Sequence, residues 1–312
     1  MLFRSVWKVP TNSLPTSLRS MYGVPFQYSA HAITNLIALI DLSPTNLVDH
    51  SVGDRIMKRR LPYHVFEADK KMAHFPAEGS VSMLDSPSDG RPKTLTAPPV
   101  LPTEAAMAET TRKILARLEL PPDELVLGKD GEPVIAFGYS TTMGYGMDKR
   151  FVQFTNTIRA TIERRIDGIP FNDPHTVQVV VREGGQLQSV ASHWPRVKAG
   201  RDLRPPTSED LVEFVRSGQA RCQIIPGPNL KVVQASEIRR FTVERVSFTW
   251  VMSLSPWKAE SAPSRYFPMA TLAGTVDVAD GKHFRMTVLC PATVDLPITA
   301  VKSEEKLPAL PH

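Results

Sequence analysis

The sequence predicts an α+β protein of two successive modules, each with one helix packed on an antiparallel β-meander. Three observations lead to this prediction: one helical periodicity after residue 103, a second after residue 207, and runs of alternating polar and apolar residues behind each. A lone amphipathic helix buries its apolar stripe against another apolar face, and the following sheet supplies one. We expect a poorly ordered region over residues 1–98, modules over 99–200 and 201–300, and a tail over 301–312.

Composition is that of a globular chain with many stiff connections. The 312 residues are 42% hydrophobic, enough to bury a core, and include 28 prolines against 17 glycines. Proline ends helices and strands, so the elements should be short. The net charge of +5 is mild, and Lys58–Arg60 is the only dense basic cluster. Nucleic acid is therefore not an expected partner.

The first third of the chain has the weakest patterns. Residues 79–99 are rich in Ser, Pro, Gly and Asp and predict a linker or exposed loop. The apolar cluster at residues 32–40 is much shorter than the ~20 residues of a membrane helix. It also lies too deep in the chain, with too little positive charge before it, for a credible signal peptide. No transmembrane helix is expected.

The first module should open with a helix. Thr103 is a plausible N-cap, and Glu104 beside it favours the positive end of a helix. Apolar and small side chains then recur at steps of four, three and four, at Met107, Thr111, Ile114 and Leu118. Pro121 and Pro122 end the pattern. A strand pair with a turn at Asp130-Gly131 should follow.

The strongest strand pattern runs from Phe151 to Ile166. Six apolar side chains share one parity and seven polar ones share the other, which predicts a half-buried antiparallel strand. The apolar set is Val152, Phe154, Ile158, Ala160, Ile162 and Ile166. Gly168 and Pro170 break the pattern, since Gly adopts conformations closed to other residues and Pro lacks an N–H. The chain should return as a strand, turn at Gly184 and Gly185, and run back.

The second module repeats this order. Residues 207–218 predict a compact helix capped by Thr207 or Ser208 and closed by Gly218. Three strands should follow, and the first of them changes parity, which predicts a bulge near Glu244. Their expected ranges are Ser236–Ser253, Tyr266–Val278 and His283–Ala292.

The stretch "RRIDGIPFNDPHTVQVVVREGGQLQSVASHW" resembles the signature of PepSY-type and thermolysin-propeptide modules. The matching turn is Gly168, Ile169, Pro170 and Phe171. The helix opening at Ser208 is similar to the second unit of tandem modules in bacterial extracytoplasmic regulators. The resemblance implies a cystatin- or PepSY-like fold and a non-catalytic role, with a peptidase or envelope protein as partner outside the cytoplasm. It assigns structural turn roles to Gly168, Pro170, Gly184 and Gly185, and no chemistry.

A search for catalytic chemistry finds no constellation. Cys290 lies in an apolar run, which favours an inert buried thiol, and it forms either a disulfide with Cys222 or a second free thiol. The eight histidines have no partners at metal-ligand spacing. No catalytic residue, metal ligand or cofactor is predicted.

Candidate contacts with a protein partner are exposed aromatic and thioether side chains of "FGYSTTMGYGMDKR", residues 137–150, whose glycines predict a flexible loop, and two side chains at the end of the meander. They are Tyr139, Met143, Tyr145, His193 and Trp194. We therefore expect a non-enzymatic binding or regulatory protein, whose open sheet edges accept a strand from a partner. The alternative is a carrier or enzyme that holds a small apolar ligand between helix and sheet.

Overall fold

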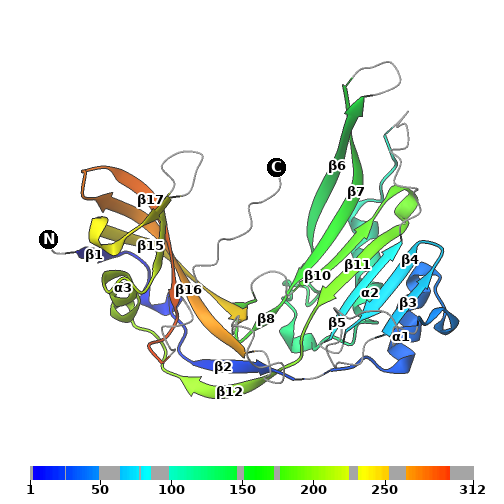
Figure 1. Cartoon of the computed structure of the whole chain (residues 1–312), viewed down its shortest axis with the longest axis horizontal. Coiled ribbons are helices and arrows are strands. Elements are labelled where there is room, and N and C mark those ends of the chain that lie inside the picture. Colours follow the sequence, from blue (N-terminus) through cyan, green and yellow to red (C-terminus); the bar gives the residue numbers. More distant parts are fainter. Residues whose placement is uncertain are drawn as a thin grey trace. The chain divides into compact units, whose positions relative to one another are not determined.

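The computed structural model divides into two compact units (Figure 1). The contiguous unit is Val24–Arg196, and the discontinuous unit combines Met1–Gly23 with Val197–His312. The structure describes residues 3–24, 26–48, 64–76, 79–85, 98–145, 151–171, 176–224, 231–252 and 265–295.

The contiguous unit is built on a seven-stranded antiparallel sheet. Its strands, in spatial order, are β3 (His64–Ala68), β4 (Lys71–Phe75), β5 (Ser80–Asp85), β11 (Leu187–His193), β10 (Thr176–Val181), β7 (Phe151–Glu163) and β6 (Ala136–Tyr145). The strands alternate buried and more exposed residues, as β10 does from Thr176 to Val181. One face of the sheet therefore lies against the core.

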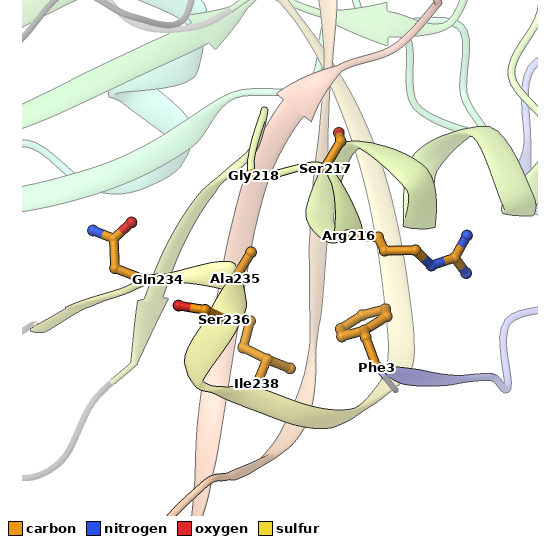
Figure 2. Close-up of a pocket in the computed structure, with 8 residues that line it drawn as sticks. All are labelled: Phe3, Arg216, Ser217, Gly218, Gln234, Ala235, Ser236 and Ile238. Carbon is orange, nitrogen blue, oxygen red and sulfur yellow. The ribbon is translucent and has the colours of Figure 1, made fainter. Parts of the chain in front are cut away.

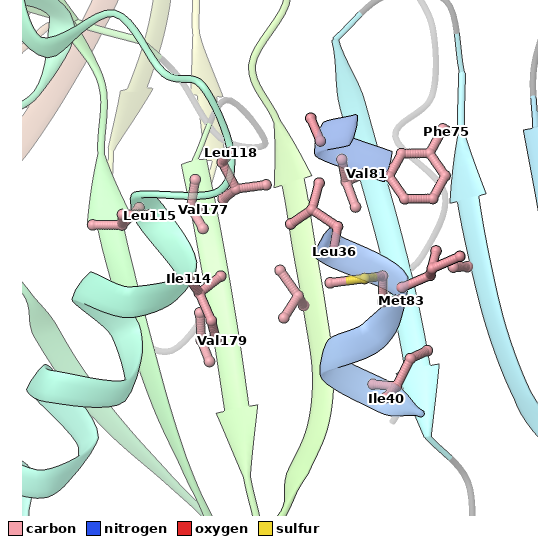
Figure 3. Close-up of a cluster of buried hydrophobic side chains, with 14 of the residues drawn as sticks. Leu36, Ile40, Phe75, Val81, Met83, Ile114, Leu115, Leu118, Val177 and Val179 are labelled. Carbon is pink, nitrogen blue, oxygen red and sulfur yellow. The ribbon is translucent and has the colours of Figure 1, made fainter. Parts of the chain in front are cut away.

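Two helices cover that face, α1 (Ala30–Ile37) and α2 (Glu104–Leu115). Ser29 and Thr103 cap them by accepting hydrogen bonds from the backbone N–H groups of Ala32 and Ala106. Their buried side chains interdigitate with those of the sheet in one cluster (Figure 3). The cluster includes Leu36, Ile40, Met83, Ile114, Leu118, Val177 and Val179.

A small hairpin follows β7, formed by β8 (Arg165–Ile166) and β9 (Ile169–Pro170). Its two-residue turn has positive φ at Asp167 (54°) and at Gly168 (74°), as a type I′ turn requires. Gly184 (φ 68°) and Gly185 (φ 76°) make the turn between β10 and β11 and also have positive φ. A Cβ at any of these three glycines meets no atom within 4 Å, so the backbone conformation is what favours glycine there.

The discontinuous unit has an eight-stranded sheet in which β1 pairs parallel to β15 and the other pairs are antiparallel. The main path is β1 (Arg4–Trp7), β15 (Ile238–Met252), β16 (Arg265–Val278), β17 (His283–Pro291), β13 (Arg221–Ile224) and β14 (Lys231–Val233). Off this path, β2 (Leu18–Gly23) pairs with β16 and with β12 (Val197–Leu203).

Helix α3 (Ser208–Arg216) contacts β17 and buries Leu211, Val212, Phe214 and Val215. A capping box starts it: Thr207 and Asp210 each bind the other's backbone N–H group. The expected bulge of β15 is confirmed by the register shift between Val243 and Arg245. Opposite it, a Cβ on Gly274 would lie 1.9 Å from the Thr242 carbonyl oxygen, so only glycine fits.

The expected architecture, two modules of one helix on one meander, is wrong. The described chain is mostly strand, with three short helices and two large sheets. Strands β3–β5 widen the first sheet beyond the meander. Helix α1 packs on the part of the sheet near β5, whereas α2 packs near β10 (Figure 3). Strands β1 and β2 join the second sheet from the other end of the chain. Part of the expected linker is also strand: β5 lies inside the first sheet with Val81 and Met83 buried.

Both predicted helices and the later strands are confirmed to within a few residues at their ends. Short 3-10 helices fill several connections: Thr11–Ser13, Ala38–Ile40, Pro44–Asn46, Pro122–Glu124, Glu183–Gly185 and Ala235–Glu237. Among the described residues, none of the helices has the length and apolar character needed to cross a membrane.

Candidate functional site

Strand β6 forms one edge of the seven-stranded sheet and pairs only with β7 among the described strands. The opposite edge differs, because the chain before β3 covers part of it. The Val48 N–H group donates to the Val65 carbonyl over 2.8 Å, and Leu47 bridges to Phe66. Ten residues of β6 thus form the long open edge of this unit.

The open edge continues beyond the body of the sheet. Strand β7 pairs with β10 only over its residues Ile158 to Glu163. It pairs with β6 over its residues Phe151 to Thr161. Residues 141–145 and 151–155 therefore form a two-stranded ribbon that projects past β10 (Figure 1). A bulge at Asn156 marks where the ribbon leaves the sheet.

Tyr139 and Met143 lie on the same side of β6 and are 56% and 62% exposed. The Tyr139 hydroxyl donates to Glu104 Oε1 over 2.7 Å, and this hydrogen bond raises the pKa of Tyr139. The ring is therefore anchored at the start of α2 while most of its surface stays accessible. Tyr145 pairs with Phe151 through the backbone, and its side chain lies outside the described residues.

His193 and Trp194 are not part of this edge, because β10 and β7 separate β11 from β6. The His193 Nδ1 atom lies 2.7 Å from the Ser80 hydroxyl. Trp194 is 1% exposed, so it is a core residue in this structure and not a surface contact. Two of the five candidate contacts, Tyr139 and Met143, are thus brought together at an accessible place.

Trp194 belongs to a buried polar cluster with Glu124 and Arg164. Glu124 Oε2 accepts hydrogen bonds from Trp194 Nε1 at 2.7 Å and from Arg164 Nε at 2.8 Å. The Arg164 guanidinium also lies over the Phe171 ring, 4.3 Å from its centroid. Arg164 is 1% exposed, so Glu124 compensates a charge that water cannot reach.

Sequence reasoning missed this cluster, although one signal was present. Arg164 has the same parity as Ile158 and Ile162, which face the core. A charge at a core-facing position needs a partner. Its partner Glu124 lies forty residues earlier, in a segment without a pattern of its own.

An open groove of about 570 Å³ lies in the discontinuous unit, at the C-terminal end of α3 (Figure 2). Phe3 and Ile238 give it an apolar side, and Ser217, Gln234 and Ser236 a polar one. Its cation, Arg216, is already paired with Glu209 and Glu213 of its own helix. None of its lining residues is a histidine, cysteine or carboxylate, so the serine hydroxyls have no base beside them there.

The two cysteines are free and buried. Burial raises the pKa of Cys222 to about 11 and that of Cys290 to about 12. Since the thiolate is the reactive form, both thiols are poor nucleophiles in the folded protein. The described ranges also hold no group of three or more His, Cys, Asp or Glu side chains placed to bind a metal ion.

Comparison with known proteins yields no match, either to a protein-family model or to a curated protein. The candidate site therefore rests on the geometry of β6.

Proposed function

We propose that this chain is a non-catalytic binding protein that accepts an extended segment of a partner protein along β6. The observation that carries the proposal is the open ten-residue edge of the seven-stranded sheet, with Tyr139 and Met143 exposed on it. A strand added to such an edge gains main-chain hydrogen bonds, and side chains of the edge select the sequence. Native proteins usually cover or charge long edges, as the chain before β3 does on the other side.

The partner class follows from the resemblance of the Gly168–Pro170 turn to propeptide modules. A peptidase, or another protein outside the cytoplasm, fits a module that binds without chemistry. The alternative carrier function would place a ligand between helix and sheet. Buried side chains such as Ile158, Ile162 and Leu211 occupy that space, so the edge is the better supported site.

The test uses a displayed library of random peptides selected on the full chain. Peptides that bind are measured against the wild type, against Tyr139→Lys with Met143→Lys, and against a matched control, Leu47→Lys with Leu127→Lys. The control replaces two other exposed apolar residues of the same unit, 52% and 53% exposed. We expect the β6 variant to weaken binding about tenfold or more and the control to leave it unchanged, since lysine on an edge strand opposes pairing.

Hydrogen exchange supplies the second measurement. A bound peptide should slow exchange of backbone N–H groups in Ala136–Tyr145, because those that face solvent become hydrogen-bonded. Exchange in β3 should not change. Protection at β3, or in the groove beside Arg216, would overturn the proposal, as would equal binding by both variants.

A further inference from the structure

The solvent-facing side of the eight-stranded sheet carries a cluster of arginines. On β16 the odd-numbered residues from Thr271 to Asp277 are partly exposed, while the even-numbered ones are buried. Strand register places exposed arginines on the same side of the sheet, on the neighbouring strands β15 and β17 and on β13 beyond β17. We call this surface the arginine face; its cations are Arg221, Arg240, Arg245 and Arg285, with Arg4 of β1 opposite Arg240.

Acidic residues on this face neutralise only part of the charge. Glu244 binds Arg285, and Asp277 lies 2.6 Å from His283 Nδ1. Among the described residues, Arg240 and Arg245 have no carboxylate within ion-pair distance. The face is therefore left with uncompensated positive charge, held on strands whose positions the sheet fixes.

Between the arginines most of the side chains are small or β-branched. Ala273 lies between Arg245 on β15 and Thr287 on β17, and Thr271 lies between Ser247 and Leu289. Small and β-branched side chains of this kind allow a second sheet face to approach to about 10 Å. Arginine is also enriched at the centres of protein interfaces.

We infer that the arginine face docks an acidic surface of a partner protein. Charge complementarity selects the sign of the partner, and the small side chains at the centre leave room for an extended acidic segment of its chain. Single-stranded nucleic acid is the competing class, but it is bound through aromatic rings that stack on bases. The rows that hold Arg245 and Arg221 carry Ala, Thr, Ser, Leu, Gln and Val in place of such rings. This inference is independent of the proposed use of β6, which belongs to the other unit.

The experiment measures fluorescence anisotropy with the full chain and a labelled peptide in which glutamate alternates with threonine. The test variant is Arg240→Glu with Arg245→Glu. Its matched control is Lys129→Glu with Arg165→Glu, which makes the same change in net charge at two exposed residues of the contiguous unit. A peptide of alternating lysine and threonine tests the sign, and a single-stranded DNA oligonucleotide tests the competing class.

We expect the acidic peptide to bind, and the arginine-face variant to weaken it about tenfold relative to the control, since exposed charge pairs contribute modestly and reversal adds repulsion. Equal loss in both variants would show binding to net charge alone and would overturn the inference. So would tighter binding of the oligonucleotide than of the acidic peptide, or binding of the basic peptide. Circular dichroism of both variants checks that each is folded.

Discussion

At the scale of single residues, one carboxylate oxygen holds together the buried polar cluster of the contiguous unit. Glu124 Oε2 accepts hydrogen bonds from both Trp194 and Arg164, and it lies 2.8 Å from a second nitrogen of the Arg164 guanidinium. A buried ion pair adds little to the free energy of unfolding compared with two apolar residues in its place. Removal of one partner, however, leaves a buried charge uncompensated. Glu124 is therefore more sensitive to substitution than the exposed carboxylates.

Replacement of Glu124 by Gln should lower the free energy of unfolding by about 3 kcal/mol, because Arg164 then stays charged in the core without a counter-ion. The matched control is Glu132→Gln. Glu132 also pairs with an arginine, Arg112 at 2.9 Å, but both side chains are about half exposed. The control should cost less than about 1 kcal/mol. Urea unfolding followed by circular dichroism measures both, and equal losses would contradict a structural role for the buried pair.

At the scale of elements, α3 shows how a short helix is held in place. Its nine residues are too few for stability on their own, so packing against β17 and capping must supply it. Thr207 N and Oγ1 donate to Asp210 Oδ2, and Arg204 pairs with Oδ1. Burial of the carboxyl favours its neutral form, but these bonds and the nearby cation outweigh it, so the pKa of Asp210 is lowered overall.

This shift makes part of the stability dependent on pH. A carboxyl whose folded pKa is depressed stabilises the fold above its unfolded pKa, near 3.8, and loses that contribution as pH falls through the folded value. The difference in unfolding free energy between the wild type and Asp210→Asn should therefore shrink below about pH 3.8. Urea titrations at a series of pH values measure it. A difference that stays constant down to acid pH would rule out a role for the ionised cap.

At the scale of the whole molecule, the chain is not divided in order of sequence. Among the described residues, the strands of the contiguous unit and its helices α1 and α2 all come from Val24–Arg196. The discontinuous unit needs β1 and β2 from the beginning of the chain, since they pair with β15, β16 and β12. The two candidate binding surfaces, β6 and the arginine face, lie on different units.

Separate expression of the units tests this division. Residues 24–196 should unfold in one cooperative transition, because their core cluster is complete. Residues 197–312 alone should melt at a lower temperature than when residues 1–23 are added as a peptide, since that peptide restores two strands of the sheet. Calorimetry with and without the peptide measures the shift. Equal melting temperatures would mean that β1 and β2 contribute nothing to the unit.

Local features of this protein are readable from its sequence because their causes are local. The periodicity of Met107, Ile114 and Leu118, the cap at Thr103 and the turn at Asp167-Gly168 each depend on residues within a few positions of one another. The exposed contacts Tyr139 and Met143 could also be named, since the aromatic and thioether side chains among the glycines of residues 137–150 favour an exposed segment. The flexible loop expected there is wrong for Ala136–Tyr145, which form β6. The prediction of Trp194 as a surface contact is wrong, because a tryptophan beside a histidine in the sequence can be either buried or exposed.

The sequence by itself determined where helices and strands begin, which face of each is apolar and where turns occur. Only the tertiary structure decided which strands are neighbours: that β5 lies between β4 and β11, that β6 is left at an edge, and that Glu124 reaches Arg164. The pattern of apolar residues in a segment predicts which face of a helix or strand is buried. It does not predict the partner, because many apolar faces fit one another and the choice among them depends on the free energy of the whole assembly of strands.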